Sequence, residues 1–144
     1  MPDLERITST FQAVDEQTRL QVLLDYAKKL PDLPADLAES AANDGSGRVH
    51  ECMTPVWMWV RKEADGVRVH ARVGEEAPTI RGIISVITHA YRGASAEELA
   101  DIPNDLVQKL GLGGVVRMNR LVGLNAMLER IRRQARAIIQ ETTS

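Results

Sequence analysis

Cys52 is the only thiol of the chain and the residue with the widest range of possible chemistry. A cysteine reacts as a nucleophile only in its thiolate form, which nearby cations favour and nearby carboxylates disfavour. Arg48 and His50 therefore favour a reactive Cys52, whereas Glu51 opposes it. Local charge leaves two interpretations open, because a lone cysteine is also common as a small buried apolar residue.

The three histidines of the chain offer two other kinds of site. His50 and Cys52 could supply two metal ligands, but His70 and His89 are the only other imidazoles and there is no second cysteine. This composition argues against a zinc site. A small cysteine hydrolase would need Cys52 to meet one of these histidines in space, and nothing in their spacing favours that arrangement.

The composition is that of an ordinary globular protein. The 144 residues are 44% hydrophobic and 26% charged, with a formal net charge of −2, and they predict one domain over residues 1–144. The slight acidity argues against a nucleic-acid partner held by overall charge. No signal peptide and no apolar run of membrane-spanning length is visible, so we expect a cytoplasmic protein without membrane association.

The first half of the chain predicts two helices, a loop and a hairpin. Apolar residues recur at helical spacing, and Pro31 and Pro34 end the second helix. Small and polar residues predict a loop over 35–47, with a glycine-containing hinge at its end. Two alternating stretches around Asp65-Gly66 then predict an antiparallel hairpin. The expected apolar positions are Leu4, Ile7, Phe11, Val14, Leu20, Leu23, Leu24 and Ala27 in the helices, and Val56, Met58, Val60, Val67, Val69, Ala71 and Val73 in the hairpin.

Trp57 and Trp59 alternate with the apolar positions and should lie on the opposite face of the hairpin. Two interpretations remain open for them, a stacking platform for a ligand or a simple cover for the sheet. Arg68 or Arg72 could stack on one of these rings from the neighbouring strand.

Four helices are predicted after the hairpin. Prolines in first turns, a Ser-x-x-Glu capping box and glycine stops mark their ends. They begin at Pro78, Ser95, Pro103 and near Asn119, and the last ends near Gln140. Their order around the hairpin predicts an α+β fold with a small antiparallel sheet packed against helices. The expected buried stripes are Ile80, Ile83, Ile84, Ile87 and Tyr91, and Leu124, Met127, Leu128, Ile131, Ala135 and Ile138.

Three stretches in register, spanning roughly residues 4–138, resemble the SufE family of sulfur acceptors, in particular its actinobacterial branch. They are Glu51-Cys52-Met53-Thr54-Pro55-Val56-Trp57, Glu76-Ala77-Pro78-Thr79-Ile80-Arg81-Gly82-Ile83, and Lys109-Leu110-Gly111-Leu112 followed by Asn119-Arg120-Leu121-Val122-Gly123-Leu124-Asn125-Ala126-Met127 and Arg130-Ile131. The resemblance implies a compact fold shared with IscU-type scaffold proteins. It also implies a carrier that takes persulfide sulfur from a SufS-type, PLP-dependent cysteine desulfurase and delivers it to an iron–sulfur cluster assembly scaffold.

Carried over by position, the resemblance makes Cys52 the persulfide acceptor, Arg120 its site partner and Arg81 a further basic residue with a less defined role. It implies no cofactor for this chain, since the PLP belongs to the desulfurase. The sequence departs from the family at Glu51, at Met53 and Pro55, and at Val115, where a glycine, two glutamines and a histidine are common.

Sulfur transfer suits the residues themselves, because thiolate attack on a persulfide is closely related to thiol–disulfide exchange. We expect Met53, Val56 and Trp57 to line an apolar pocket that shields Cys52 until a partner docks. Two alternatives stay open. One is a helical adaptor module in which Cys52 is structural, and the other is the small cysteine hydrolase.

Overall fold

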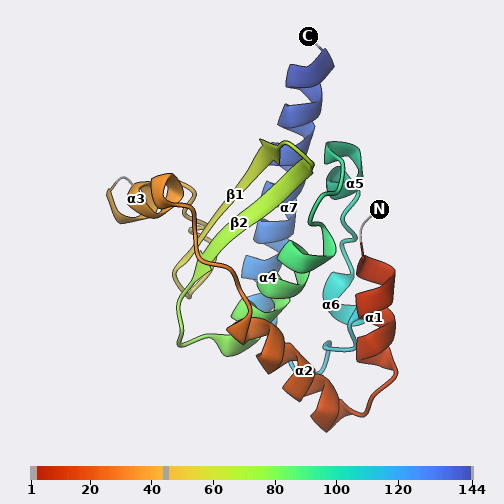
Figure 1. The fold of residues 1–144 in the computed structure, drawn as a ribbon. Helices are drawn as coiled ribbons and strands as arrows, with labels where there is room; N and C mark the ends of the chain where they lie inside the picture. The colour runs from red at the N-terminus through yellow and green to blue at the C-terminus, as the bar shows by residue number, and fades with distance from the viewer. Residues whose placement is uncertain (1–2, 44–45, 144) are drawn as a thin grey trace.

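The computed structural model describes residues 3–43 and 46–143. The described part folds as helices around one antiparallel hairpin, which confirms the α+β prediction (Figure 1). The elements are α1 (Leu4–Gln12), α2 (Glu16–Lys28), α3 (Ala35–Asn43), β1 (Val56–Glu63), β2 (Gly66–Val73), α4 (Pro78–Ala90), α5 (Ala96–Ala100), α6 (Leu106–Lys109) and α7 (Met118–Thr143).

The hairpin forms in the predicted register. Val56 pairs with Val73 and Val60 with Val69, and Gly66 begins β2 with a φ of 135° that suits a glycine in a tight turn. The valines and Met58 are buried, whereas Trp57 and Trp59 alternate with them on the other face and are partly exposed. The two-residue period of the sequence therefore predicts correctly which residues lie on each face of the hairpin.

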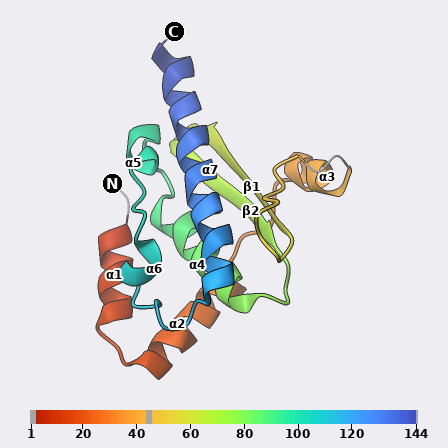
Figure 2. The ribbon, with the colours of Figure 1, turned by 180° about the vertical axis from the view of Figure 1, so that it is seen from behind.

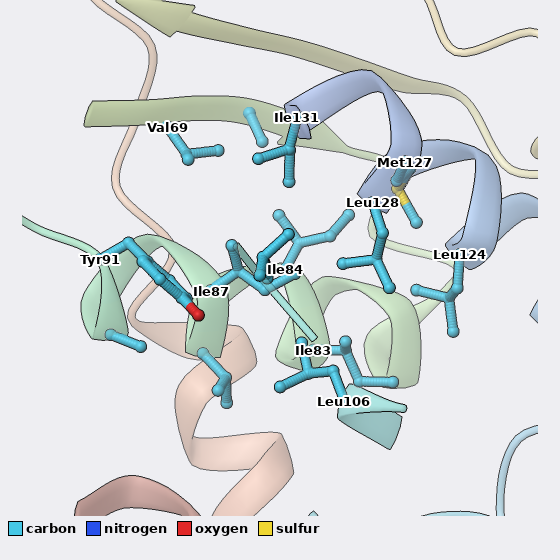
Figure 3. Packing of buried hydrophobic residues seen from close by; sticks show 14 of the residues in the cluster. Val69, Ile83, Ile84, Ile87, Tyr91, Leu106, Leu124, Met127, Leu128 and Ile131 are labelled. Atoms are coloured by element: carbon cyan, nitrogen blue, oxygen red, sulfur yellow. The ribbon is translucent and has the colours of Figure 1, made fainter. Parts of the chain in front are cut away.

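Helices α4 and α7 cover the buried face of the hairpin, with α4 packed on β2 and α7 on β1 (Figures 1 and 2). The predicted isoleucines of α4 are buried. Figure 3 shows Ile84 facing Leu128 of α7, and Ile83 beside Leu106. Helix α2 crosses α4 on the side away from α7. The core thus places the first turns of α7 beside the start of α4, which is where the site is built.

Side chains of α7 also bind the outer edge of β1. The Val60 N–H donates to Gln134 Oε1 at 2.6 Å, and Arg130 Nε donates to the Met58 carbonyl oxygen at 3.3 Å. An open strand edge leaves backbone groups unpaired and invites association with other strands. These two contacts satisfy part of that edge and hold α7 along it.

The prediction of a loop over 35–47 is wrong for most of its length, because Ala35–Asn43 forms α3. Leu37 and Ala41 are four residues apart and both buried, and alanine is the strongest helix former. The small residues that resembled a loop therefore form a short helix with one buried stripe. Asp44 and Gly45, part of the expected hinge, lie outside the described residues.

Three smaller expectations also need correction. The helix expected at Pro103 begins at Leu106. In α2 only Leu23 and Ala27 of the four expected apolar positions are buried, whereas Leu20 is exposed at 37% and Leu24 is partly buried. The cation that lies over a tryptophan is Arg48, whose guanidinium is 5.0 Å from the centre of the Trp57 ring. The loop before the hairpin pairs with β1 and so brings Arg48 onto this ring.

The capping predictions hold at α5, where Ser95 and Glu98 form the reciprocal capping box. The last helix extends to Thr143, three residues beyond the predicted end. Among the described residues, none of the helices is both long enough and apolar enough to cross a bilayer.

Candidate functional site

The segment that carries Cys52 is a loop held closed at its base. The Val49 N–H donates to the Val56 carbonyl oxygen at 2.9 Å, and the Met58 N–H donates to the Gly47 carbonyl oxygen at 2.8 Å. Beyond this base, residues 50–55 form a turn, and the Cys52 N–H points back to the Val49 carbonyl oxygen at 3.3 Å. The turn holds Cys52 at a defined place relative to the sheet.

Glycine is required at the base of this loop. Gly47 has a φ of 83°, and a side chain there would collide with the indole of Trp59. Gly47 is buried and bonded to Met58, so it fixes the loop instead of serving as the hinge expected from the sequence. Thr54 is buried, and the Pro55 carbonyl oxygen accepts from the Gly74 N–H at 3.0 Å. Any outward movement of Cys52 must therefore arise in residues 50–53, where His50, Glu51 and Met53 are exposed.

The thiol of Cys52 lies against the second turn of α7. A Cβ atom built on Gly123 would stand 2.8 Å from the Cys52 sulfur and 3.1 Å from its Cα. These distances are shorter than normal van der Waals contact, so α7 can approach the thiol this closely only because residue 123 has no side chain. Cys52 itself is half-buried.

Beside the thiol is a small cavity of about 20 Å³. Ile80 at the start of α4 contributes an apolar wall, and Arg120 on α7 contributes a cationic one. A water-sized group needs about 10–15 Å³ of such space, so the cavity holds a single atom of that size. Its lining residues are Cys52, Met53, Thr54, Ile80, Arg120 and Gly123.

The surroundings of Cys52 disfavour its thiolate. Burial is the largest cause of a raised thiol pKa, and the carboxylate of Glu51 raises the pKa further. Arg48 acts in the opposite direction, but part of its guanidinium faces the Trp57 ring. The opposing effects of Glu51 and Arg48 are those expected from the sequence.

The structure brings together two of the three basic and nucleophilic residues singled out from the sequence. Cys52 and Arg120 share the cavity, whereas Arg81 does not line it. Arg81 Nε donates to the Ala27 carbonyl oxygen at 2.9 Å, and its terminal nitrogen donates to the Val73 carbonyl oxygen at 3.0 Å. Its guanidinium therefore ties the end of α2 to the end of β2.

The expected apolar lining is only partly right. Met53 lines the cavity although its side chain is 78% exposed, but Val56 is completely buried and Trp57 borders a different hollow. Val56 faces the core and Trp57 the opposite face of the hairpin, and neither lines the cavity. Gly123 and Ile80 were not identified as site residues from the sequence, although an isolated glycine inside a helical pattern signals a close approach.

The other histidines are engaged elsewhere. His70 Nε2 lies 3.3 Å from Glu63 Oε1, and His89 Nδ1 lies 2.7 Å from the Ser85 carbonyl oxygen. Neither lines the Cys52 cavity. Within residues 3–43 and 46–143, no group of three or more His, Cys, Asp or Glu side chains is placed to hold a metal ion.

Comparison with known proteins adds independent findings. The family model described as "SufE: Fe-S metabolism associated domain" matches residues 5–135. An uncharacterized SufE-like protein of Mycobacterium tuberculosis is 37% identical over 134 residues, which cover 92% of this chain and 91% of that protein. The sulfur acceptor protein CsdE of Escherichia coli is 30% identical over 129 residues, covering 88% and 84% of the two chains.

The fold also matches a solved structure closely. A solution structure of a hypothetical protein from Thermus thermophilus superposes with a TM-score of 0.82 at 30% sequence identity. The match covers 97% of this chain and 98% of the other. The sheet and the helices around it are therefore a shared architecture.

Proposed function

The chain belongs to the SufE family of sulfur acceptors, and from this premise we propose that Cys52 carries sulfur as a persulfide. The donor is the persulfide of a PLP-dependent cysteine desulfurase of the SufS type, which this protein stimulates. The recipient is an iron–sulfur cluster assembly scaffold. Arg120 is the residue that accompanies Cys52 in this role, and PLP remains with the desulfurase.

The observation that carries this proposal is the match between the thiol and its cavity. A persulfide adds one sulfur atom to Cys52, and the adjoining space of about 20 Å³ has room for one group of that size. Ile80 and the backbone at Gly123 exclude bulkier groups from the same place. A sulfur atom lodged there is partly shielded from thiols in bulk solvent.

The transfer balances as a thiol–persulfide exchange. The Cys52 thiol gives its proton to solvent or to a base of the partner, and the resulting thiolate attacks the outer sulfur of the donor persulfide. The new bond joins Cys52 Sγ to that sulfur, and the donor S–S bond breaks as the donor cysteine leaves as a thiolate. No net oxidation or reduction occurs. The cation of Arg48 favours the thiolate of Cys52. Arg120 lines the cavity that would hold the transferred sulfur.

The docking surface for the desulfurase is formed by the exposed apolar side chains Met53, Met118 and Val122. They are 78%, 79% and 60% exposed, respectively. Met53 follows Cys52 directly, and the other two lie on the first two turns of α7, which also carry Arg120 and Gly123. Large exposed apolar groups beside a site are typical of a protein interface.

Mass spectrometry tests the proposal. After incubation with a desulfurase, PLP and cysteine, the intact protein should gain the mass of one sulfur atom. The C52S variant should keep its fold, because serine is nearly isosteric, but it should neither gain sulfur nor stimulate the desulfurase. Stimulation by C52S in the presence of a physiological reductant would contradict the carrier function. Retained binding without an adduct on the native chain would favour the adaptor, and an acyl adduct from an ester would favour the hydrolase.

A further inference from the structure

A second and larger hollow lies next to the Cys52 cavity. Its volume is about 420 Å³, enough for a molecule the size of an amino acid, and Arg120 forms a wall of both spaces. Thr79 borders the hollow and the next residue, Ile80, borders the cavity. The residues lining the hollow are Ala77, Pro78, Thr79, Val115, Arg117 and Arg120.

The hollow is cationic and contains no compensating carboxylate. Arg117 and Arg120 are its two charged lining residues, and neither makes an ion pair or a side-chain hydrogen bond within the described part of the chain. Other arginines are paired, as in the contact of Arg61 with Asp36 at 2.6 Å. Glu76 directly precedes the lining residue Ala77 in sequence, but its carboxylate lies against Gly74 and does not line the hollow.

The position of these arginines is electrostatically unfavourable without an anion. The Arg120 and Leu121 N–H groups both donate to the Arg117 carbonyl oxygen at 3.0 Å. Arg117 and Arg120 are therefore about one helical turn apart at the start of α7. Cations are normally disfavoured at a helix N-terminus, and like charges at this spacing repel. The first turn of α7 has no acidic residue to offset them. Local rules are broken in this way most often at functional sites.

We propose that this hollow binds the carboxylate of a small thiol and so gives the Cys52 persulfide a low-molecular-weight acceptor. Arg117 and Arg120 hold the carboxylate. The thiol end of the molecule extends past Arg120, which borders both spaces, toward Cys52. This inference rests on the proposed function, because it requires sulfur on Cys52. The volume of about 420 Å³ accommodates the whole of a small acceptor and not only its carboxylate.

The transfer balances without an added oxidant or reductant. The thiolate of the small molecule attacks the outer sulfur of the Cys52 persulfide, and a new S–S bond forms between them. The bond between Cys52 Sγ and the outer sulfur breaks, and Cys52 leaves as a thiolate that takes a proton from solvent. The products are a small persulfide and the free thiol of Cys52.

A pair of alkylating reagents tests the carboxylate site without any persulfide. Iodoacetate and iodoacetamide transfer nearly the same group to a thiol, but only iodoacetate carries a carboxylate. The ratio of the iodoacetate rate to the iodoacetamide rate at Cys52, divided by the same ratio for N-acetylcysteine amide, which has no carboxylate, should be about ten at low salt. It should fall as ionic strength rises. R117Q should lower this normalised ratio at least about threefold, whereas R133Q, an exposed charge on the same helix, should not.

A normalised ratio near one in the native chain would overturn the carboxylate site. The acceptor itself is tested with protein loaded at Cys52 by a desulfurase. At equal thiolate concentration, 3-mercaptopropionate should remove the sulfur about tenfold faster than 2-mercaptoethanol, and R117Q should reduce this advantage. Equal rates for the two thiols would overturn the small acceptor and indicate an acidic side chain of a partner. Failure to load Cys52 at all would contradict the proposed function, whatever the alkylation ratio.

Discussion

The Cβ atom that Gly123 lacks would stand 2.8 Å from the sulfur of Cys52. At this position helix α7 meets the thiol with its backbone and not with a side chain. A glycine inside a helix usually costs stability relative to alanine, because it leaves the unfolded chain more freedom. Here that cost accompanies a close approach that no other residue allows.

The first prediction concerns this contact. Replacing a helical glycine by alanine normally stabilises a protein by about 0.5–1 kcal/mol. At Gly123 we expect the opposite sign, a loss of about 1–3 kcal/mol from overpacking, together with displacement of Cys52 toward solvent. Urea denaturation should show the loss, and alkylation of G123A by iodoacetamide should be faster than that of the native chain.

Gly113 provides the matched control, because a Cβ atom at that position meets no other atom within 4 Å. G113A should therefore keep both the native alkylation rate and a urea midpoint at or above the native value. A G123A protein that is more stable than the native chain, with an unchanged alkylation rate, would show that the thiol does not depend on this glycine.

The second prediction concerns the pH dependence of the Cys52 thiol. Burial and Glu51 raise its pKa, so its alkylation rate should reach half of its maximum at a higher pH than that of an unfolded cysteine peptide. Removing the carboxylate in E51Q favours the thiolate, lowers the pKa and speeds alkylation near neutral pH. E39Q, which changes an exposed residue of α3, should leave the pH profile of alkylation unchanged. Identical profiles for E51Q and the native chain would exclude the carboxylate as a cause.

The same shift affects stability with a defined sign. The folded chain holds the Cys52 proton more tightly than the unfolded chain does, so this contribution is fully present below the unfolded pKa. It decreases as the pH rises above about 8.5, the usual pKa of a cysteine. The native protein should therefore lose more stability between pH 8 and 10 than C52S does.

The pattern of apolar residues was sufficient to predict the hairpin and its faces. Period-two alternation around Asp65-Gly66 has one register that buries the valines, and the structure adopts it. Alanine-rich α3 was not predicted, because its buried stripe consists of only Leu37 and Ala41 and was too short to establish a period. Short helices depend on tertiary contacts that a local pattern does not contain.

The site was only partly predictable for a related reason. Cys52 and Glu51 are neighbours in sequence, so their electrostatic relationship could be anticipated and agrees with the structure. Gly123, Ile80 and Arg117 come from distant segments, and only the packing of α7 beside α4 brings them near the thiol. The resemblance to a family identified Arg120, but spacing alone gave no reason to choose it.

The third prediction tests the buried face of α4. Ile84 is completely buried between the hairpin and α7, so I84A should lower the free energy of unfolding by about 2–5 kcal/mol. Arg92, just after α4, is exposed, and R92A should change it by less than about 0.5 kcal/mol. Urea midpoints measure both variants, and equal midpoints would refute the assigned faces.

The last prediction is that docking of a desulfurase exposes Cys52. In the free chain the thiol is half-buried against Gly123 and its thiolate is disfavoured, so alkylation by iodoacetamide should be slow. The base of the loop is fixed by the bonds of Val49 and Met58, and the Pro55 carbonyl oxygen accepts from the Gly74 N–H at 3.0 Å. We therefore expect an outward movement to be confined to residues 50–53. A catalytically inactive desulfurase should therefore raise the second-order alkylation rate across pH 6–9.

Variants at two exposed apolar residues distinguish specific docking from nonspecific effects of the partner on the alkylation rate. V122D places a charge within the proposed docking surface and should reduce the acceleration, whereas L20D changes an exposed leucine on α2 and should not. The acceleration arises because the turn must leave α7 before a donor sulfur can approach Cys52 in line with its new bond. A free-chain rate equal to that of an unfolded cysteine peptide, unchanged by the partner, would mean that the thiol is always open and that no gating occurs.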